Sequence, residues 1–461
     1  MLARWAPLPW VVPLFAHFQS QVPHVAVLAS RADAELVART VVGAGDRVSS
    51  HRTRIDRTGG GGPMPFYRSV GDVPRKRHTQ FRRPDGGLYA EELMGQEGFS
   101  SDMSLLYHRH LPTAIVKAEA VEMPAAAEQL VANHPLLPRH FRTQTLPAGG
   151  DLVGSRQLLM ANDDVRLSFV AADRSSELYR NATGDEVVYL QAGRARFESV
   201  YGALEVGEGD YVVIPMATTH RWVLDGGAPL RAMVIEARGH VRPPKRYLSN
   251  HGQFLEHAPY CERDLRGPTE PLSLDQGETP VLVRHRAGLT RYTYLNHPFD
   301  LVGWDGCLYP YAFNIRDFEP IVKRVHMPPP THQTFEGPNF VVCSFCPRPL
   351  DFDPEAVPIP YNHHNVDSDE MLFYVGGDYS ARKGSGIGLG SISLHPSGFT
   401  HGPQPGSVEA SLGQPRTDEM AVMVDTFRPL HLGPAARQSE DPEYAWTWAR
   451  GQQAREARGG G

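Results

Sequence analysis

The stretch YNHHNVDSDE, residues 361–370, places two adjacent histidines and three acidic residues within ten positions. Imidazole nitrogens and carboxylate oxygens are ligands for divalent transition metals, so this stretch is the first candidate for chemistry. Side chains alternate between the two faces of a strand, so His363 and His364 are expected to point in opposite directions. Residues 366–369 are typical of a turn, which would let Glu370 begin the next strand and return towards His363.

The pattern around this stretch occurs twice in the chain. Tyr179, Asn181, Glu186 and Gly193 follow Y-x-N-x4-E-x6-G, and residues 363–377 follow H-x-N-x4-E-x6-G. A later motif, G-x5-P-x-[AG]-x2-H, ends once at His220 and once at His401. Two motifs repeated in the same order, roughly 180 residues apart, indicate an internal duplication.

The second copy carries a set of residues that suits a metal. His363, Glu370 and His401 supply two imidazoles and one carboxylate, which is the facial arrangement of non-haem Fe(II) oxygenases with three positions left open. Manganese or zinc could use the same ligands. Asp369 is the alternative carboxylate if the turn closes differently, and His364 is expected at the surface or behind the ligands.

The first copy has lost this set. Tyr179 stands in the place of His363, and Asn181 in that of Asn365, so only Glu186 and His220 remain, and we expect this half to be structural. A separate H-x-H pair, His108 and His110, has no carboxylate at a matching distance. It is predicted to be structural or to lie on the surface.

Short apolar runs bounded by Gly, Asp or Pro recur along the chain, for example EVVYLQAG, DYVVIP and MLFYVGG. They predict an antiparallel sandwich or barrel, with one helical interlude at residues 120–135. The two repeated motifs resemble the signature motifs of the cupin fold. This resemblance implies an all-β dominated bicupin, in which two jelly-roll β-barrels follow an N-terminal arm and a few short helices are added.

The expected boundaries follow from the motifs and from changes in composition. Residues 1–63 are poor in acidic residues and end in RTGGGGP before Met64, so they are predicted to be a disordered or non-native extension. The remaining segments are an N-terminal arm (64–145), a first barrel with a degenerate metal motif (146–240), a connecting segment (241–320), a second barrel with the metal site (321–435) and a C-terminal tail (436–461).

Composition excludes several classes of protein. A net charge of -6 argues against nucleic acid as the main partner, because phosphate binding needs a basic surface. No run of about 20 apolar residues is present, so no membrane span is expected. Four cysteines are too few for a disulfide-built secreted domain, which favours a cytoplasmic location. Cys343 and Cys346 form a CxxC pair in an apolar run and are predicted to be buried strand cysteines without a function of their own.

From about Met64 to about Pro434 the chain resembles the homogentisate 1,2-dioxygenases. The stretches that carry the resemblance are PFDLVGWDGCLYPYAFNIRDF, PYNHHNVDSDE, GGDYSARKG and SLHPSGFTHGP. The resemblance implies a homo-oligomeric bicupin whose second barrel holds Fe(II). It also implies dioxygen-dependent cleavage of homogentisate (2,5-dihydroxyphenylacetate) or a close dihydroxylated aromatic acid, giving maleylacetoacetate in tyrosine and phenylalanine catabolism.

The resemblance also assigns roles to individual residues. His363, Glu370 and His401 match the iron ligands. The catalytic histidine of the family is matched best by His326, with His332 as the alternative. The residues that match the substrate-binding groups are Tyr379, Arg382 or Lys383, and His395, which lies six residues before the last ligand.

The chain also departs from the family pattern. It reads Trp304-Asp305-Gly306 where family members have W-H-G, and it has one more residue before the metal-binding glutamate. We therefore expect a divergent member, in which iron chemistry is better supported than the particular ring substrate. The rival classes are a metal-dependent cupin isomerase and a non-catalytic, ligand-binding bicupin.

Overall fold

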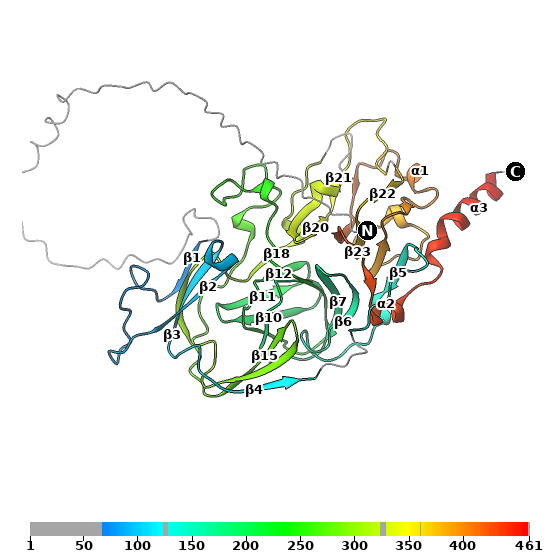
Figure 1. Cartoon of the computed structure of the whole chain (residues 1–461). Coiled ribbons are helices and arrows are strands. Elements are labelled where there is room, and N and C mark those ends of the chain that lie inside the picture. Colours follow the sequence, from blue (N-terminus) through cyan, green and yellow to red (C-terminus); the bar gives the residue numbers. More distant parts are fainter. Residues whose placement is uncertain (1–66, 123–127, 323–328, 360, 460–461) are drawn as a thin grey trace, which may run out of the picture. The chain divides into compact units, whose positions relative to one another are not determined.

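The computed structural model describes residues 67–122, 128–322, 329–359 and 361–459, and all of them belong to one compact unit, Gly61–Gly461 (Figure 1). This part of the chain is built almost entirely from strands, with three short α-helices, so the all-β bicupin prediction is confirmed. None of the helices in these residues is long and apolar enough to cross a membrane.

Two seven-stranded sheets form the first barrel. The first sheet has the order β11 (Gly202–Gly207), β10 (Arg194–Ser199), β13 (His220–Val223), β8 (Tyr179–Asn181), β15 (Thr279–His285), β16 (Gly288–Tyr294) and β4 (Ile115–Val121). The second has the order β18 (Tyr311–Asn314), β12 (Asp210–Ile214), β9 (Glu186–Ala192), β14 (Leu230–Ala237), β7 (Val165–Ala172), β6 (Gln157–Ala161) and β28 (His431–Leu432). Strands from outside residues 146–240 therefore extend both sheets.

The second barrel is smaller. Its main sheet has the order β19 (Gln333–Gly337), β20 (Phe340–Phe345), β27 (Met420–Thr426), β23 (Asp369–Gly376), β24 (Ser391–His395) and β5 (Arg139–Arg142). Two short pairs accompany it: β21 (Arg348–Pro349) with β26 (Arg416–Thr417), and β22 (His363–His364) with β25 (Thr400–His401). A separate four-stranded sheet has the order β1 (Arg68–Gly71), β17 (Leu301–Gly306), β3 (Met103–His108) and β2 (Ala90–Gly95).

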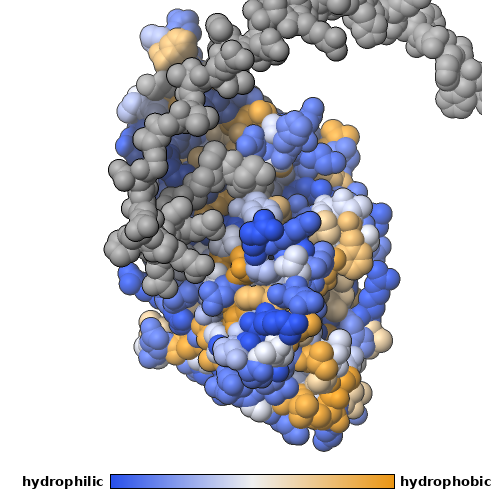
Figure 2. Space-filling model, turned by 90° about the vertical axis from the view of Figure 1, so that its left-hand side faces the viewer, coloured by the Kyte–Doolittle hydropathy of each residue, from blue (hydrophilic) through white to orange (hydrophobic). Residues whose placement is uncertain are grey.

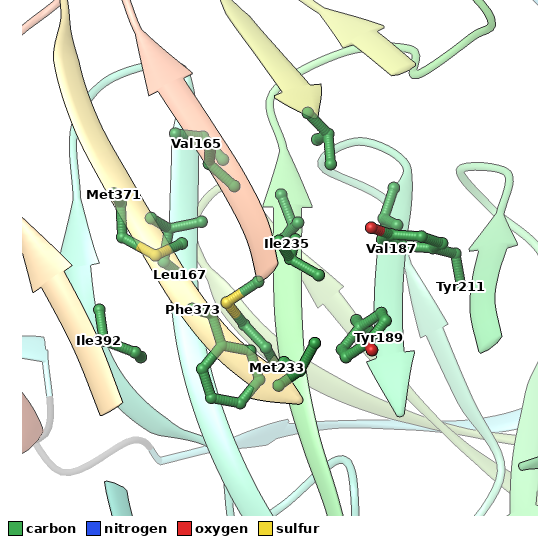
Figure 3. Close-up of a cluster of buried hydrophobic side chains, with 14 of the residues drawn as sticks. Val165, Leu167, Val187, Tyr189, Tyr211, Met233, Ile235, Met371, Phe373 and Ile392 are labelled. Carbon is green, nitrogen blue, oxygen red and sulfur yellow. The ribbon is translucent and has the colours of Figure 1, made fainter. Parts of the chain in front are cut away.

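One hydrophobic core joins the two barrels. Figure 3 shows Val187 and Tyr189 of β9 in the same cluster as Met371 and Phe373 of β23, and the Tyr189 and Phe373 rings meet edge to face at 6.3 Å. The alternate residues of β9, Val188 and Leu190, point into the first barrel instead. A strand buried on both faces needs apolar residues at successive positions, which explains the run Val187–Leu190 within EVVYLQAG.

The same alternation determines which side chains of β23 point into the second barrel. On β23, Met371 and Phe373 belong to the core shared by the barrels, whereas Leu372 and Tyr374 belong to a small cluster inside the second barrel. Glu370 has the parity of this second pair, so its carboxylate is directed into the barrel. The glycine that closes the motif, Gly377, has φ of +76°, and an added Cβ would collide with the Asp418 carbonyl oxygen.

The helices lie near the C-terminus: α1 (Ser407–Ser411), α2 (Pro434–Ser439) and α3 (Thr447–Gly459). The helical interlude predicted at residues 120–135 is wrong for the residues that the structure describes. β4 ends at Val121, and residues 128–135 contain no α-helix. The alanines there suggest a helix, but the β4 pairing with β16 decides the conformation of residues 115–121.

Candidate metal centre

Two histidines from different strands face each other at the mouth of the second barrel. His363 and His401 are direct partners in the antiparallel pair β22–β25, and their ring centroids are 4.2 Å apart. Nδ1 of His401 donates a hydrogen bond to the Phe399 carbonyl oxygen at 3.3 Å, which leaves the lone pair of Nε2 free. The Nε2 atoms of both histidines are buried and have no hydrogen-bond partner in the described part of the chain. Such atoms are ready to bind a cation.

Glu370 completes the group. Its Oε2 lies 3.6 Å from Nε2 of His363, and its Oε1 lies 3.5 Å from Nε2 of His401. The three ligand atoms lie within 4.8 Å of one another, so the three predicted metal ligands are brought together. The alternative carboxylate, Asp369, accepts backbone hydrogen bonds from Ser397 and Leu430 and has a structural role in the turn.

Two imidazoles and one carboxylate that converge in this way fit a divalent transition metal. Burial alone would raise the pKa of the Glu370 carboxyl, but the three surrounding imidazoles hold it well below its usual range. The carboxylate is therefore ionised, as a metal ligand must be. His364 is on the exposed side of β22, where Nδ1 lies 3.4 Å from the Thr400 hydroxyl.

Behind the three ligands, His395 holds Glu370 in place. Its Nδ1 lies 2.7 Å from Glu370 Oε1, and its Nε2 lies 3.0 Å from the Tyr444 hydroxyl. Burial lowers the pKa of His395 to about 3, so the ring is neutral and carries one proton. With that proton on Nδ1, His395 donates to Glu370 and accepts from Tyr444. Both ring nitrogens are then used within the protein, so this geometry supports a role in orienting the carboxylate.

Asp425 lies directly opposite Glu370 on the neighbouring strand β27. Its Oδ1 is buried and has no hydrogen-bond partner in the described residues. Burial and the nearby charge of Glu370 raise the pKa of the Asp425 carboxyl well above its usual value. A second carboxyl group therefore sits beside the candidate ligands, and sequence spacing gave no signal for it.

The residues that match substrate-binding groups differ in their surroundings. Arg382 is buried and donates to the Tyr374 hydroxyl and to the Gly402 carbonyl oxygen, so its guanidinium ties together the loops behind the ligands. Lys383 is exposed. Tyr379 packs against Tyr374 with ring centroids 5.0 Å apart, and burial raises its pKa to about 12.

Of the two candidate catalytic histidines, His326 lies outside the described residues. His332 is buried against Phe345, with ring centroids 4.6 Å apart. Its Nδ1 has no hydrogen-bond partner in the described part of the chain, and burial lowers its pKa to about 3. His332 is thus a neutral imidazole with a weakly basic nitrogen.

The first barrel shows what fills the corresponding place when no metal set is present. Tyr179 and His220 are direct partners across β8 and β13, as His363 and His401 are across β22 and β25. Both guanidinium nitrogens of Arg156 donate to the two Glu186 oxygens at 2.8 Å. Asn181 also donates to Glu186 at 2.8 Å. An internal cation therefore neutralises the motif carboxylate.

This arrangement explains why the first barrel needs no metal. Arg156 also lies 3.3 Å from Glu236, which occupies the register position of Asp425 opposite the motif glutamate. The Arg156 charge outweighs burial and lowers the pKa of Glu186 to about 2. Sequence reasoning missed Arg156 because it precedes the motif by some 25 residues and belongs to no recognisable pattern.

The H-x-H pair in the N-terminal arm is separate from both motifs. His108 is buried, with Nδ1 2.5 Å from Asp300 and Nε2 2.9 Å from Glu92. These two carboxylates outweigh burial and raise the pKa of His108 to about 9. His110 lies 3.1 Å from Asp275 at the surface. Neither histidine belongs to a group of described residues that could hold a metal ion.

Comparison with known proteins identifies the family that this chain matches. The family model for the N-terminal part of homogentisate 1,2-dioxygenase matches residues 68–315, and the model for its C-terminal part matches residues 315–454. A protein of Saccharolobus solfataricus named "Putative dioxygenase" is 39% identical over 391 residues, which cover 84% of this chain and 99% of the relative.

More distant relatives carry the family name itself. The homogentisate 1,2-dioxygenase of Rhodopseudomonas palustris is 29% identical over 78% of this chain and 86% of its own length, and that of Emericella nidulans is 26% identical over 71% and 77%. Two solved structures match with a TM-score of 0.30 each. A cupin 2 conserved barrel domain protein from Leptotrichia buccalis is 10% identical and covers 63% of this chain and 97% of its own, and protein Ylba from E. coli is 9% identical and covers 65% and 94%.

Proposed function

The chain belongs to the homogentisate 1,2-dioxygenase family, and we propose that it is an Fe(II)-dependent dioxygenase that opens the ring of homogentisate or of a close dihydroxylated aromatic acid. With homogentisate the product is maleylacetoacetate, which retains both atoms of dioxygen. The observation that carries the proposal is the group of His363, Glu370 and His401, with two buried imidazole nitrogens left without partners.

These three residues would hold the metal and leave three positions for substrate and dioxygen. When bound, Fe(II) would relay electron density from the electron-rich ring to dioxygen and so permit a reaction that is otherwise spin-forbidden. His395 keeps Glu370 oriented through the 2.7 Å contact to Oε1, and Tyr444 fixes His395 in turn. A carboxylate held in this way loses little freedom when the metal binds.

The substrate needs groups that bind its carboxylate and accept its phenolic proton. Tyr379 and Lys383 suit the first role, because a hydroxyl and an ammonium group form strong hydrogen bonds with a carboxylate. Arg382 adds a buried positive charge behind them, and its fixed contacts favour positioning over direct binding. The proton acceptor is His326 or His332. The low pKa of His332 makes it a weak base near neutral pH.

The test is oxygen consumption by protein reconstituted with Fe(II). An oxygen electrode should record one dioxygen per homogentisate, and the product should appear in the same ratio. A panel containing 2,5-dihydroxybenzoate and 3,4-dihydroxyphenylacetate identifies the ring that is preferred. Consumption by a metal-free preparation would contradict the metal dependence of the proposal. No consumption with any dihydroxylated acid would contradict the proposal and favour the isomerase or the binding protein.

A further inference from the structure

Strand β4 is an open edge. It is the last strand of the first seven-stranded sheet, after β15 and β16, and it pairs with β16 on one side. No described strand pairs with its other side (Figure 1). Six of its seven residues, from Ile115 to Ala120, are exposed. The N–H and C=O groups that an edge strand directs outwards are a template for a further strand.

The sequence of this edge, IVKAEAV, is complementary to itself. When two copies lie antiparallel with Ala118 opposite Ala118, Ile115 of each copy faces Val121 of the other. In the same register Lys117 of each copy faces Glu119 of the other, so two ion pairs form across the contact. Lys117 Nζ and Glu119 Oε1 are already 2.8 Å apart within one copy, which places both charges on the same face of the strand.

Charge selects this register over its neighbours. A two-fold axis through such a contact requires one residue to lie opposite itself. With Lys117 on the axis two ammonium groups oppose each other, and with Glu119 on the axis two carboxylates do. A lone lysine would keep a second edge away, which is a common protection of open edges. Glu119, two positions later, turns that repulsion into attraction when Ala118 lies on the axis.

A groove lies beside β4 and extends the surface that a second copy would contact. Leu88, Leu111 and Leu295 are exposed around it, and Arg83 and Arg109 line it together with Ala114. Figure 2 shows apolar side chains gathered towards the lower end of the molecule, the end at which β4 lies in Figure 1.

Extending the register by one residue past β4 places Glu122 of the second copy opposite Ala114 of the first. Its carboxylate would therefore approach the groove that Arg83 and Arg109 line. This adds a second group of opposite charges to each half of the contact, from residues outside the strand itself.

We propose that a second copy of this chain docks along β4, in an antiparallel pairing centred on Ala118 that continues the first-barrel sheet across two copies. The main-chain hydrogen bonds supply most of the affinity, and the Lys117–Glu119 pairs set the register. The contact lies on the first barrel and its arm, and it uses none of the candidate metal ligands.

Charge reversal tests the pairing in the full chain. Lys117→Glu and Glu119→Lys each place like charges opposite each other, so the mass measured by light scattering should fall to half that of the wild type. The double variant Lys117→Glu/Glu119→Lys restores opposite charges and should recover the wild-type mass. An equimolar mixture of the two single variants should recover it as well, because one edge is then acidic and the other basic.

Wild-type mass in both single variants, or no recovery in the double variant, would overturn the proposal. Circular dichroism shows whether each variant folds. A cross-link gives an independent measurement: opposed Cα atoms in an antiparallel pair lie about 4.5–5.5 Å apart, within disulfide range. Mild oxidation of Ala118→Cys should give a covalent dimer, whereas wild type and Ala120→Cys, whose partner would be Val116, should stay monomeric on a denaturing gel. A dimer band of equal strength in all three also contradicts the pairing.

Discussion

His363 and His401 lie directly opposite each other in the two-residue antiparallel pair β22–β25. One backbone register therefore sets two of the three candidate ligands, although 37 residues separate them in the chain. The third, Glu370, is the second residue of β23, the strand that follows the turn after β22, and His395 contacts its carboxylate from behind. Backbone pairing and the Glu370–His395 contact together position the three groups.

The first prediction concerns metal binding. His363→Ala removes one of two free imidazole nitrogens, so metal affinity should fall by more than the roughly 10–100-fold that changes behind a ligand cost. His364→Ala, its neighbour on the exposed side of β22, should leave affinity unchanged. Metal content after dialysis against a limiting chelator measures both. Equal metal content in the two variants would contradict the assignment of His363.

The second prediction separates two roles of His395. If His395 orients Glu370, His395→Ala should weaken metal binding by roughly 10–100-fold. If it only binds substrate, the metal content should stay at the wild-type level and KM should rise. Tyr444→Phe keeps the ring but removes the hydroxyl that contacts Nε2, so it should cause a smaller loss of metal in the same direction. Competition with a coloured chelator gives the affinities.

Sequence reasoning succeeded where chemistry is local. The spacing of His363, Glu370 and His401 follows from strand alternation and one turn, and the structure brings these residues together. The barrels follow from runs of apolar residues with turn signals. The degenerate copy helped as well, since the glutamate recurs in it although the first histidine is replaced by Tyr179.

Contacts between residues that lie far apart in the chain could not be predicted from the sequence. Nothing near Tyr444 indicates that it contacts His395, 49 residues earlier, and Asp425 meets Glu370 only because β27 and β23 are neighbours. The helix expected at 120–135 is wrong for the described residues of that range, and the reason is similar. Its first residues pair with β16, some 170 residues away, and such pairing overrides the local preference of alanine.

The third prediction concerns the guanidinium in the first barrel. Arg156→Leu leaves Glu186 and Glu236 buried without their shared cation, so the free energy of unfolding should fall by roughly 3–5 kcal/mol. Metal content per folded protein should not change, because the centre lies in the other barrel. Urea unfolding measures the change in the free energy of unfolding, and metal analysis of the folded fraction measures the metal content.

A matched variant makes this test specific. Arg156→Leu/Glu186→Gln removes one of the buried charges together with its partner, so it should recover part of the lost stability. A single variant as stable as the wild type would show that the Arg156–Glu186 pair contributes nothing measurable. A double variant less stable than the single one would place the loss in packing against Tyr179, over whose ring Arg156 lies at 5.3 Å.

The fourth prediction is a pH dependence in the N-terminal arm. The folded-state pKa of His108 is raised to about 9 by Asp300 and Glu92, which together outweigh burial. A raised pKa stabilises the folded state fully below the unfolded value of about 6.5, and this contribution is lost as pH rises through about 9. The loss amounts to roughly 3 kcal/mol, since each pKa unit corresponds to about 1.4 kcal/mol. Asp300→Asn removes the stronger partner, so its unfolding free energy should be lower at pH 6 and should change less between pH 6 and pH 9.5 than that of the wild type. Chemical unfolding at both pH values measures the free energy of unfolding of each protein. If it changed with pH by the same amount in the variant and in the wild type, the charge on His108 would be contradicted.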